Sequence, residues 1–230
     1  MRNRKLAKTL LIVVAMILVC VLSVFATIAY LTSQSEVANN TFTVGDVKIT
    51  LDETDVDIYG VKDGETRVIK NDYKLVPNHT YVKDPTVTVK ADSEESYVRM
   101  FVEITNISKV REVFGADFLP QDFVNGWDDS VWETTNIVYE TGDAAYYEFR
   151  YFETVDTLNG EDLVLDALFD SFKVPENVLN EKLALLKGME INVRAQAIQA
   201  DGFKGNADNA FNALNNGVAI DAAGIAALFA

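Results

Sequence analysis

The stretch Ser96-Tyr97-Val98-Arg99-Met100-Phe101-Val102-Glu103-Ile104-Thr105 decides the fold of this chain. Val98, Met100, Val102 and Ile104 fall on one face of an extended strand, and mainly polar, charged or aromatic residues fall on the other. Apolar residues that recur with a period of two are typical of a half-buried β-strand. The stretch therefore predicts a long strand with one face on a core.

The same alternation recurs along the chain, between turn-forming pairs such as Asp63-Gly64, Asn125-Gly126 and Asn159-Gly160. Further strands are predicted at residues 47–51, 86–90, 136–140, 145–152, 167–174 and 191–197. Short helices are predicted at residues 108–118, 161–168, 178–187 and 207–214. Many short strands with one polar face each predict an all-β fold, an antiparallel sandwich of two sheets with short helical insertions. The tail from residue 218 to 230 is either a second packed helix or a partner-binding segment.

The N-terminus has the pattern of a secretory signal. Four basic residues precede an apolar run over residues 10–28, and small residues follow. We expect residues 1–29 to be a signal peptide, cleaved between Ala29 and Tyr30, so that the protein is secreted and extracellular. The apolar run also reaches the ~18 residues that span a bilayer, so a retained membrane anchor stays open as an alternative.

Charge and cysteine content exclude several classes of function. The formal net charge of −15 disfavours binding to nucleic acid, because phosphates are repelled. Cys20 is the single cysteine and lies inside the predicted signal, so the mature protein has no disulfide, thiolate metal site or cysteine nucleophile. We expect the mature domain to be held by its core alone.

The sequence contains no recognisable catalytic set. His79 is the single histidine, which rules out zinc motifs with two imidazoles, and no Gly-x-Ser-x-Gly elbow is present. Pro77-Asn78-His79-Thr80 is typical of a surface turn. We predict no catalytic residue, no metal ligand and no cofactor.

Two acidic segments invite other interpretations. Residues 52–57 (Asp-Glu-Thr-Asp-Val-Asp) match a calcium loop poorly, because Tyr59 takes the place of a third ligand. A solvated acidic strand end is favoured, with weak surface calcium binding left open. Asp128-Asp129 lies near Trp127 and Trp132, a combination that glycosidases use, but adjacent carboxylates in a turn usually face water.

Several blocks of sequence resemble one known family. They are Thr27–Thr32, Asn40–Leu51, Leu75–Val89, Ser96–Val102 and Ala195–Phe203. Together they are similar to the TasA/camelysin (CalY-like) family of proteins secreted by Gram-positive bacteria and processed by a SipW-type signal peptidase. The tail after Leu214 has no counterpart in the family.

The resemblance implies a jelly-roll β-sandwich that assembles into extracellular fibres of the biofilm matrix. In such fibres the N-terminal segment of one subunit joins a neighbour's sheet as an extra strand. Carried onto this chain, residues 30–45 are the donor segment, with Val37, Phe42 and Val44 as apolar anchors. Residues 46–205 are then the sandwich domain, and residues 206–230 a C-terminal helix and tail.

The leading hypothesis is therefore a secreted structural subunit of matrix fibres that is not an enzyme. Its expected partners are further copies of itself, a SipW-type signal peptidase and an accessory matrix protein, and no nucleic acid. One alternative is a camelysin-like secreted metalloendopeptidase, although a single histidine provides no recognisable zinc site. The other is a monomeric surface adhesin anchored by an uncleaved N-terminal helix. A leader with no defined structure is the simplest alternative to strand donation.

Overall fold

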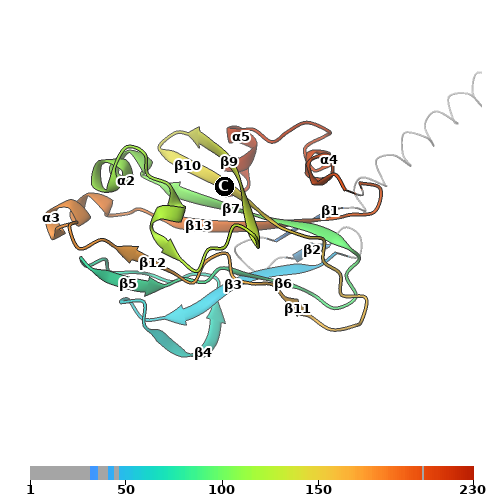
Figure 1. Ribbon diagram of the computed structural model, residues 1–230, viewed down its shortest axis with the longest axis horizontal. Coiled ribbons are helices and arrows are strands. Elements are labelled where there is room, and N and C mark those ends of the chain that lie inside the picture. Colours follow the sequence, from blue (N-terminus) through green and yellow to red (C-terminus); the bar gives the residue numbers. More distant parts are fainter. Residues whose placement is uncertain (1–31, 36–40, 44–46, 204) are drawn as a thin grey trace, which may run out of the picture.

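The computed structural model describes residues 32–35, 41–43, 47–203 and 205–230. Within them the chain forms antiparallel sheets and a few short helices, which confirms the prediction of an all-β fold. The strands lie in two layers that face each other across the core (Figure 1). The predicted signal peptide, residues 1–29, lies outside the described residues.

One layer is a six-stranded sheet with the order β2-β1-β13-β7-β10-β9. Its centre is the long antiparallel pair of β7 and β13, which runs from Ile191 opposite Ile104 to Gln199 opposite Ser96. The strands are β1 (Thr32–Ser35), β2 (Thr41–Thr43), β7 (Ser96–Thr105), β9 (Trp132–Thr141), β10 (Ala144–Tyr151) and β13 (Ile191–Gln199).

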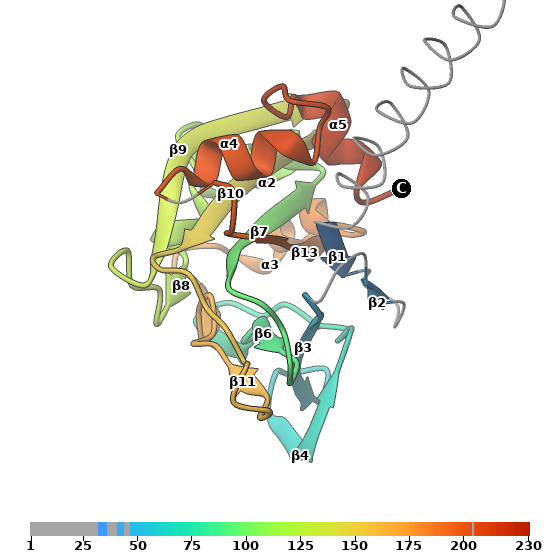
Figure 2. The same cartoon turned by 90° about the vertical axis from the view of Figure 1, so that its right-hand side faces the viewer.

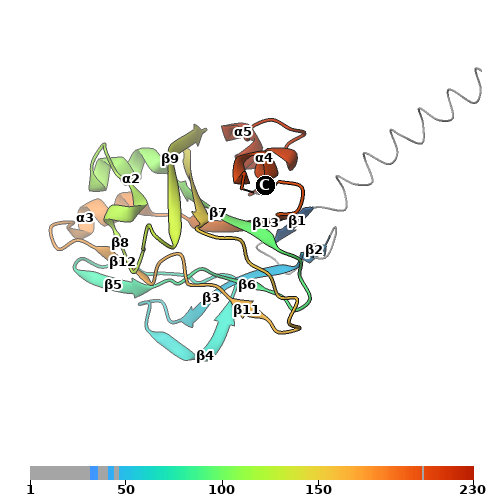
Figure 3. The same ribbon diagram turned by 45° about the vertical axis from the view of Figure 1, so that its right-hand side comes forward.

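The facing layer consists of a four-stranded sheet, β11-β6-β3-β4, and a three-stranded sheet, β5-β12-β8. Strands β3, β4, β5 and β6 lie along the lower side of the molecule in Figure 3. The strands are β3 (Ile49–Val56), β4 (Lys62–Val68), β5 (His79–Val82), β6 (Thr86–Val89), β8 (Val124–Asn125), β11 (Leu163–Val164) and β12 (Ser171–Val174).

The alternating residues of β7 face the core as predicted. Val98, Met100, Val102 and Ile104 are buried and belong to the cluster that also contains Ile49 of β3. Burial of apolar side chains between two sheets contributes about 25 cal/mol per Å² removed from water. The period of two in the sequence therefore corresponds to the inner face of the sandwich.

The helices are short and lie at the ends of strands or over a sheet. Three of the four predicted helical segments are helical in part, and the tail forms a further helix. Helix α4 starts at Asn206, whose side chain accepts a hydrogen bond from the Asn209 N–H at 2.9 Å. The helices are α2 (Ile107–Phe114), η1 (Pro120–Asp122), α3 (Asn180–Leu183), η2 (Ala184–Leu186), α4 (Ala207–Ala213) and α5 (Ala222–Ala227).

The helix predicted at residues 161–168 is wrong. Leu163 and Val164 instead form β11, opposite Val89 and Thr88 of β6. Asp162 holds this segment to the end of β6, because its carboxylate accepts a hydrogen bond from the Ala91 N–H at 2.8 Å. Similarly, the strand predicted at residues 167–174 begins only at Ser171. At residues 163–164 pairing with β6 overrides the local pattern.

The outer face of the six-stranded sheet is covered instead of facing water. Arg99 is 2% exposed and Phe101 is fully buried. Helices α4 and α5 of the C-terminal segment lie over this sheet (Figure 2). Phe211 of α4 packs beside Ile198, and Ile225 of α5 belongs to the cluster that contains Phe101. Of the two possibilities for the tail, the structure shows the packed helix.

None of the helices in the described ranges has the length and apolar character needed to cross a membrane.

Candidate functional site

The N-terminal segment lies on one edge of the six-stranded sheet. Strand β1 pairs antiparallel with β13, placing Thr32 opposite Ile198 and Gln34 opposite Gln196. Strand β2 then pairs with β1 and forms the outermost strand. The part of the predicted donor segment that the structure describes is therefore in β conformation on its own chain's sheet.

Of the residues predicted for the cleavage site and the donor strand, the structure describes only Phe42. Phe42 lies in β2, with its backbone opposite Gln34. Ala29, Tyr30, Val37 and Val44 lie outside the described residues. Cleavage and apolar anchoring accordingly stay predictions.

Strand β13 extends well beyond the part that β1 covers. Its residues 191–194 pair with residues 101–104 of β7 on one side. No strand in the described part of the chain pairs with residues 191–194 on the other side. A sheet edge of this kind presents backbone N–H and C=O groups that another extended segment can pair with.

A groove of about 640 Å³ lies beside this edge. Both layers of the sandwich line it, because Leu51 and Glu53 come from β3 while Ile191 and Val193 come from β13. Leu186 of η2 closes its apolar part. The groove thus lies where β3 and β13 approach each other along the open side of the sandwich.

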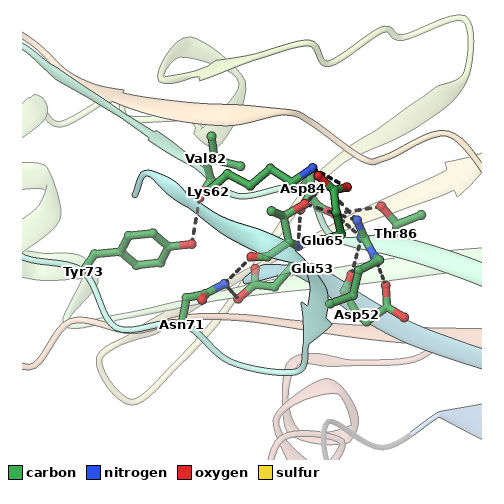
Figure 4. Close-up of polar contacts among 11 residues, drawn as sticks. Asp52, Glu53, Lys62, Glu65, Asn71, Tyr73, Val82, Asp84 and Thr86 are labelled. Carbon is green, nitrogen blue, oxygen red and sulfur yellow. Dashed lines mark hydrogen bonds and ion pairs between the residues drawn. The ribbon is translucent and has the colours of Figure 1, made fainter. Parts of the chain in front are cut away.

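Polar side chains concentrate along β3, and of these Asp52 and Glu53 line the groove. Arg67 forms ion pairs with Asp52 and, at 3.0 Å, with Asp84. Both oxygens of Asp84 also accept hydrogen bonds from Thr54, at 2.6 Å from its N–H and 2.7 Å from its hydroxyl. Figure 4 shows the polar contacts of Asp52 and Asp84, beside Glu53 and Asn71.

Glu53 and Lys83 form a buried ion pair, which is not among the features predicted from the sequence. Nζ of Lys83 lies 2.6 Å from Oε2 of Glu53, and the two side chains are 8% and 7% exposed. Asn71 donates to Oε1 of the same carboxylate at 3.1 Å. Burial, followed by the negative charge of Glu53, raises the pKa of Tyr73, which lines the same groove.

The expectation of a fully solvated acidic strand end over residues 52–57 is therefore wrong at Glu53. A signal was present in the sequence, because the period of two in β3 puts Glu53 on the same face as Ile49 and Leu51. Asp57 has a local role instead and accepts hydrogen bonds from the N–H groups of Tyr59 and Val61. Within the described ranges, no three His, Cys, Asp or Glu side chains are grouped to hold a metal ion.

The other residues singled out in the sequence are placed by structural contacts. His79 begins β5, and its Nε2 lies 2.7 Å from the carbonyl oxygen of Tyr59. Trp132 is buried and donates from Nε1 to the carbonyl of Asp166 at 2.9 Å. Asp128 binds the N–H and hydroxyl of Ser130, and these hydrogen bonds lower the pKa of its carboxyl group. The tryptophan and carboxylates do not form an open sugar-stacking platform.

Comparisons of the chain with family models, with curated proteins and with solved structures found no match.

Proposed function

We propose that this protein is a secreted structural subunit of extracellular fibres, assembled when the N-terminal segment of one copy pairs with β13 of the next. The observation that carries the proposal is the register of β1 on β13, with Ser33 opposite Ala197. The paired segment precedes the strands of the sandwich in the sequence, and a neighbouring copy carries an identical segment. Exchange of identical elements between copies is a known route to assemblies.

Exchange of β1 between copies needs no contact surface other than the one that β1 and β13 already form within one chain. A donated strand makes the same backbone hydrogen bonds with β13 as the chain's own β1. The pairing that is broken when the chain's own β1 leaves is made again with the donated strand, so a higher protein concentration favours assembly. The free edge at residues 191–194 and the adjoining groove provide further pairing and apolar contact for a longer donated segment.

The finer description follows the family resemblance. We propose a jelly-roll connectivity for the sandwich and membership of the TasA/camelysin group of biofilm-matrix proteins. We also propose removal of residues 1–29 by a SipW-type signal peptidase, followed by release from the cell. Sequencing the N-terminus of the protein recovered from medium tests this, because a start at Tyr30 is expected and an intact Met1 in the membrane fraction favours the anchored adhesin.

A pair of engineered cysteines tests strand exchange directly. Ser33→Cys together with Ala197→Cys places two thiols on opposed backbone positions of β1 and β13. The native chain has no cysteine after Cys20, so no other thiol in the secreted form competes. When filaments of the secreted double variant are oxidised, we expect a ladder of covalent multimers on a non-reducing denaturing gel, and its collapse on reduction.

Two controls complete the experiment. The single variant Ser33→Cys should form filaments without a ladder, since its thiol has no partner across the strand pair. The double variant oxidised before assembly should stay monomeric, because its strand is locked on its own sheet, and reduction should restore filaments. Filaments that contain only disulfides within single chains would rule out exchange at β13.

A further inference from the structure

Lys83 is a buried amine with an unusually small set of partners. Its side chain is 8% exposed and its Nζ is 2.6 Å from Oε2 of Glu53. Across the described residues, Glu53 is the one hydrogen-bond acceptor for this nitrogen, although an ammonium group has three N–H donors. A buried ammonium group whose donors are only partly paired loses hydration that the protein does not fully replace.

Asn71 occupies the other oxygen of the same carboxylate. Its Nδ2 donates to Oε1 of Glu53 at 3.1 Å and to the carbonyl of Thr54 at 2.8 Å. Its Oδ1 accepts a hydrogen bond from the Val56 N–H at 3.1 Å. The side-chain amide is therefore fixed at both ends, and it points toward Glu53 in Figure 4.

The environment suits a reaction between these side chains. A backbone N–H on Oδ1 polarises the amide carbonyl and stabilises negative charge that develops on its oxygen. Glu53 contacts both nitrogens and so is placed to move a proton from one to the other. Tyr73 and Phe172, whose rings lie 5.3 Å apart, line the same groove beside these side chains.

We propose that Lys83 and Asn71 form an intramolecular isopeptide bond, with Glu53 as the proton-transfer group. Glu53 takes a proton from the Lys83 ammonium, and the neutral Nζ attacks Cγ of Asn71. A bond forms between Nζ and Cγ while the bond between Cγ and Nδ2 breaks. Glu53 gives this proton to Nδ2, which leaves as ammonia, and takes up the second proton that Nζ loses as the amide forms; that proton is then released to water. An ammonium group and a primary amide thus become a secondary amide, ammonia and one proton, with no oxidant, reductant or co-reactant.

The bond would link the segment after β4 to the residue that follows β5. It would enclose residues 71–83 in a covalent ring, including the Tyr81 side chain that packs against Phe172 at 4.9 Å between ring centroids. Covalent closure of a loop stabilises a fold mainly by restricting the unfolded chain. A chain whose single cysteine is Cys20 would gain in this way what other extracellular domains gain from disulfides. This inference does not depend on fibre assembly.

Mass spectrometry of the intact purified protein tests the bond. We expect a mass lower than that of the sequence, calculated from the protein's own N-terminus, by one ammonia molecule. Protease digestion and fragmentation should then identify a branched peptide in which Lys83 is joined to Asn71. Lys83→Arg, Asn71→Ala and Glu53→Gln should each restore the full sequence mass and abolish the branched peptide.

The matched control is Lys62→Arg, because Lys62 forms an ion pair with Glu65 at 2.9 Å but is half exposed. This variant should keep the mass deficit. Ammonia can also leave when asparagine cyclises before glycine, as at Asn125, Asn159 or Asn216. A deficit that persists in Lys83→Arg, or a wild-type protein with the full sequence mass, would overturn the proposal. The wild-type measurement decides the matter even if a variant fails to fold.

Discussion

Nη1 of Arg99 lies 3.1 Å from Oε1 of Glu148, and both side chains are only 2% exposed. Arg99 also donates to Oε1 of Gln196 from Nε at 2.9 Å and from Nη2 at 2.7 Å. Its guanidinium lies 4.3 Å from the centroid of the Phe211 ring. Because these residues belong to β7, β10, β13 and α4, one buried cation joins three adjacent strands to the C-terminal helix.

Replacing Arg99 by methionine should lower the free energy of unfolding by about 3 kcal/mol, because Glu148 stays buried after losing one of its two cationic partners. Arg150, whose Nε is 2.9 Å from the same oxygen, compensates in part. Urea unfolding measures the loss. Lys90→Met is the control, since the Lys90–Asp162 pair is 40% and 44% exposed and should be worth less than about 1 kcal/mol. Equal losses in the two variants would contradict the role given to burial.

The C-terminal tail should contribute to stability through a small number of side chains. Ile225 of α5 is fully buried against the cluster that contains Phe101 and Tyr146. Ile225→Ala should cost about 2–4 kcal/mol in urea unfolding, through lost burial and the cavity left behind. Val218→Ala is the matched control, because Val218 is 63% exposed and its truncation should cost almost nothing. If both substitutions are neutral, the tail does not stay on the sheet in solution.

The same cluster should make stability depend on alkaline pH. Burial, with a smaller contribution from Glu103, raises the pKa of Tyr146 to about 12 from an ordinary value of 10.0. The unfolded chain therefore ionises first, and the free energy of unfolding should be fully retained below pH 10.0 and fall as pH rises toward about 12. Tyr146→Phe should reduce this fall, as measured by urea unfolding at a series of pH values.

Tyr59→Phe is the comparison, because Tyr59 is 40% exposed and far from the tail cluster in sequence. Its slope of stability against pH should stay close to that of the wild type. A Tyr146→Phe slope identical to that of the wild type would mean that the phenol is accessible to water in the folded protein.

Local pattern was sufficient to predict the inner faces of the sandwich. The alternation in β7 and β13 gave the correct strands because each has one face on the core, where every second residue must be apolar. It gave no information on the opposite face. Arg99 and Phe101 look like solvent-facing positions in the sequence, and only the packing of a segment more than a hundred residues away buries them.

The meeting of the polar side chains in the groove could not be predicted from the sequence, because it also depends on contacts between distant segments. Lys83, Asn71 and Glu53 come from three separate segments, and their meeting depends on how β3, β4 and β5 are placed. A carboxylate on the apolar face of β3 was the one visible indication, and a buried carboxylate requires a partner. The sequence does not say which lysine supplies it.

Two nearby glycines, Gly60 in the turn after β3 and Gly64 in β4, have similar backbone conformations but different surroundings. Gly60 and Gly64 have φ values of 72° and 79°, which non-glycine residues adopt at a cost of about 1–2 kcal/mol. A Cβ on Gly60 would lie 2.7 Å from Cα of Tyr81, whereas a Cβ on Gly64 would have no neighbour within 4 Å. Tyr81 is held in place, since its hydroxyl accepts from the Val76 N–H at 2.7 Å and donates to the Lys74 carbonyl at 2.8 Å.

Gly60→Ala should therefore destabilise the protein by about 1–3 kcal/mol more than Gly64→Ala in urea unfolding, because overpacking adds to the shared backbone strain. Equal effects would show that β5 can move away from the turn.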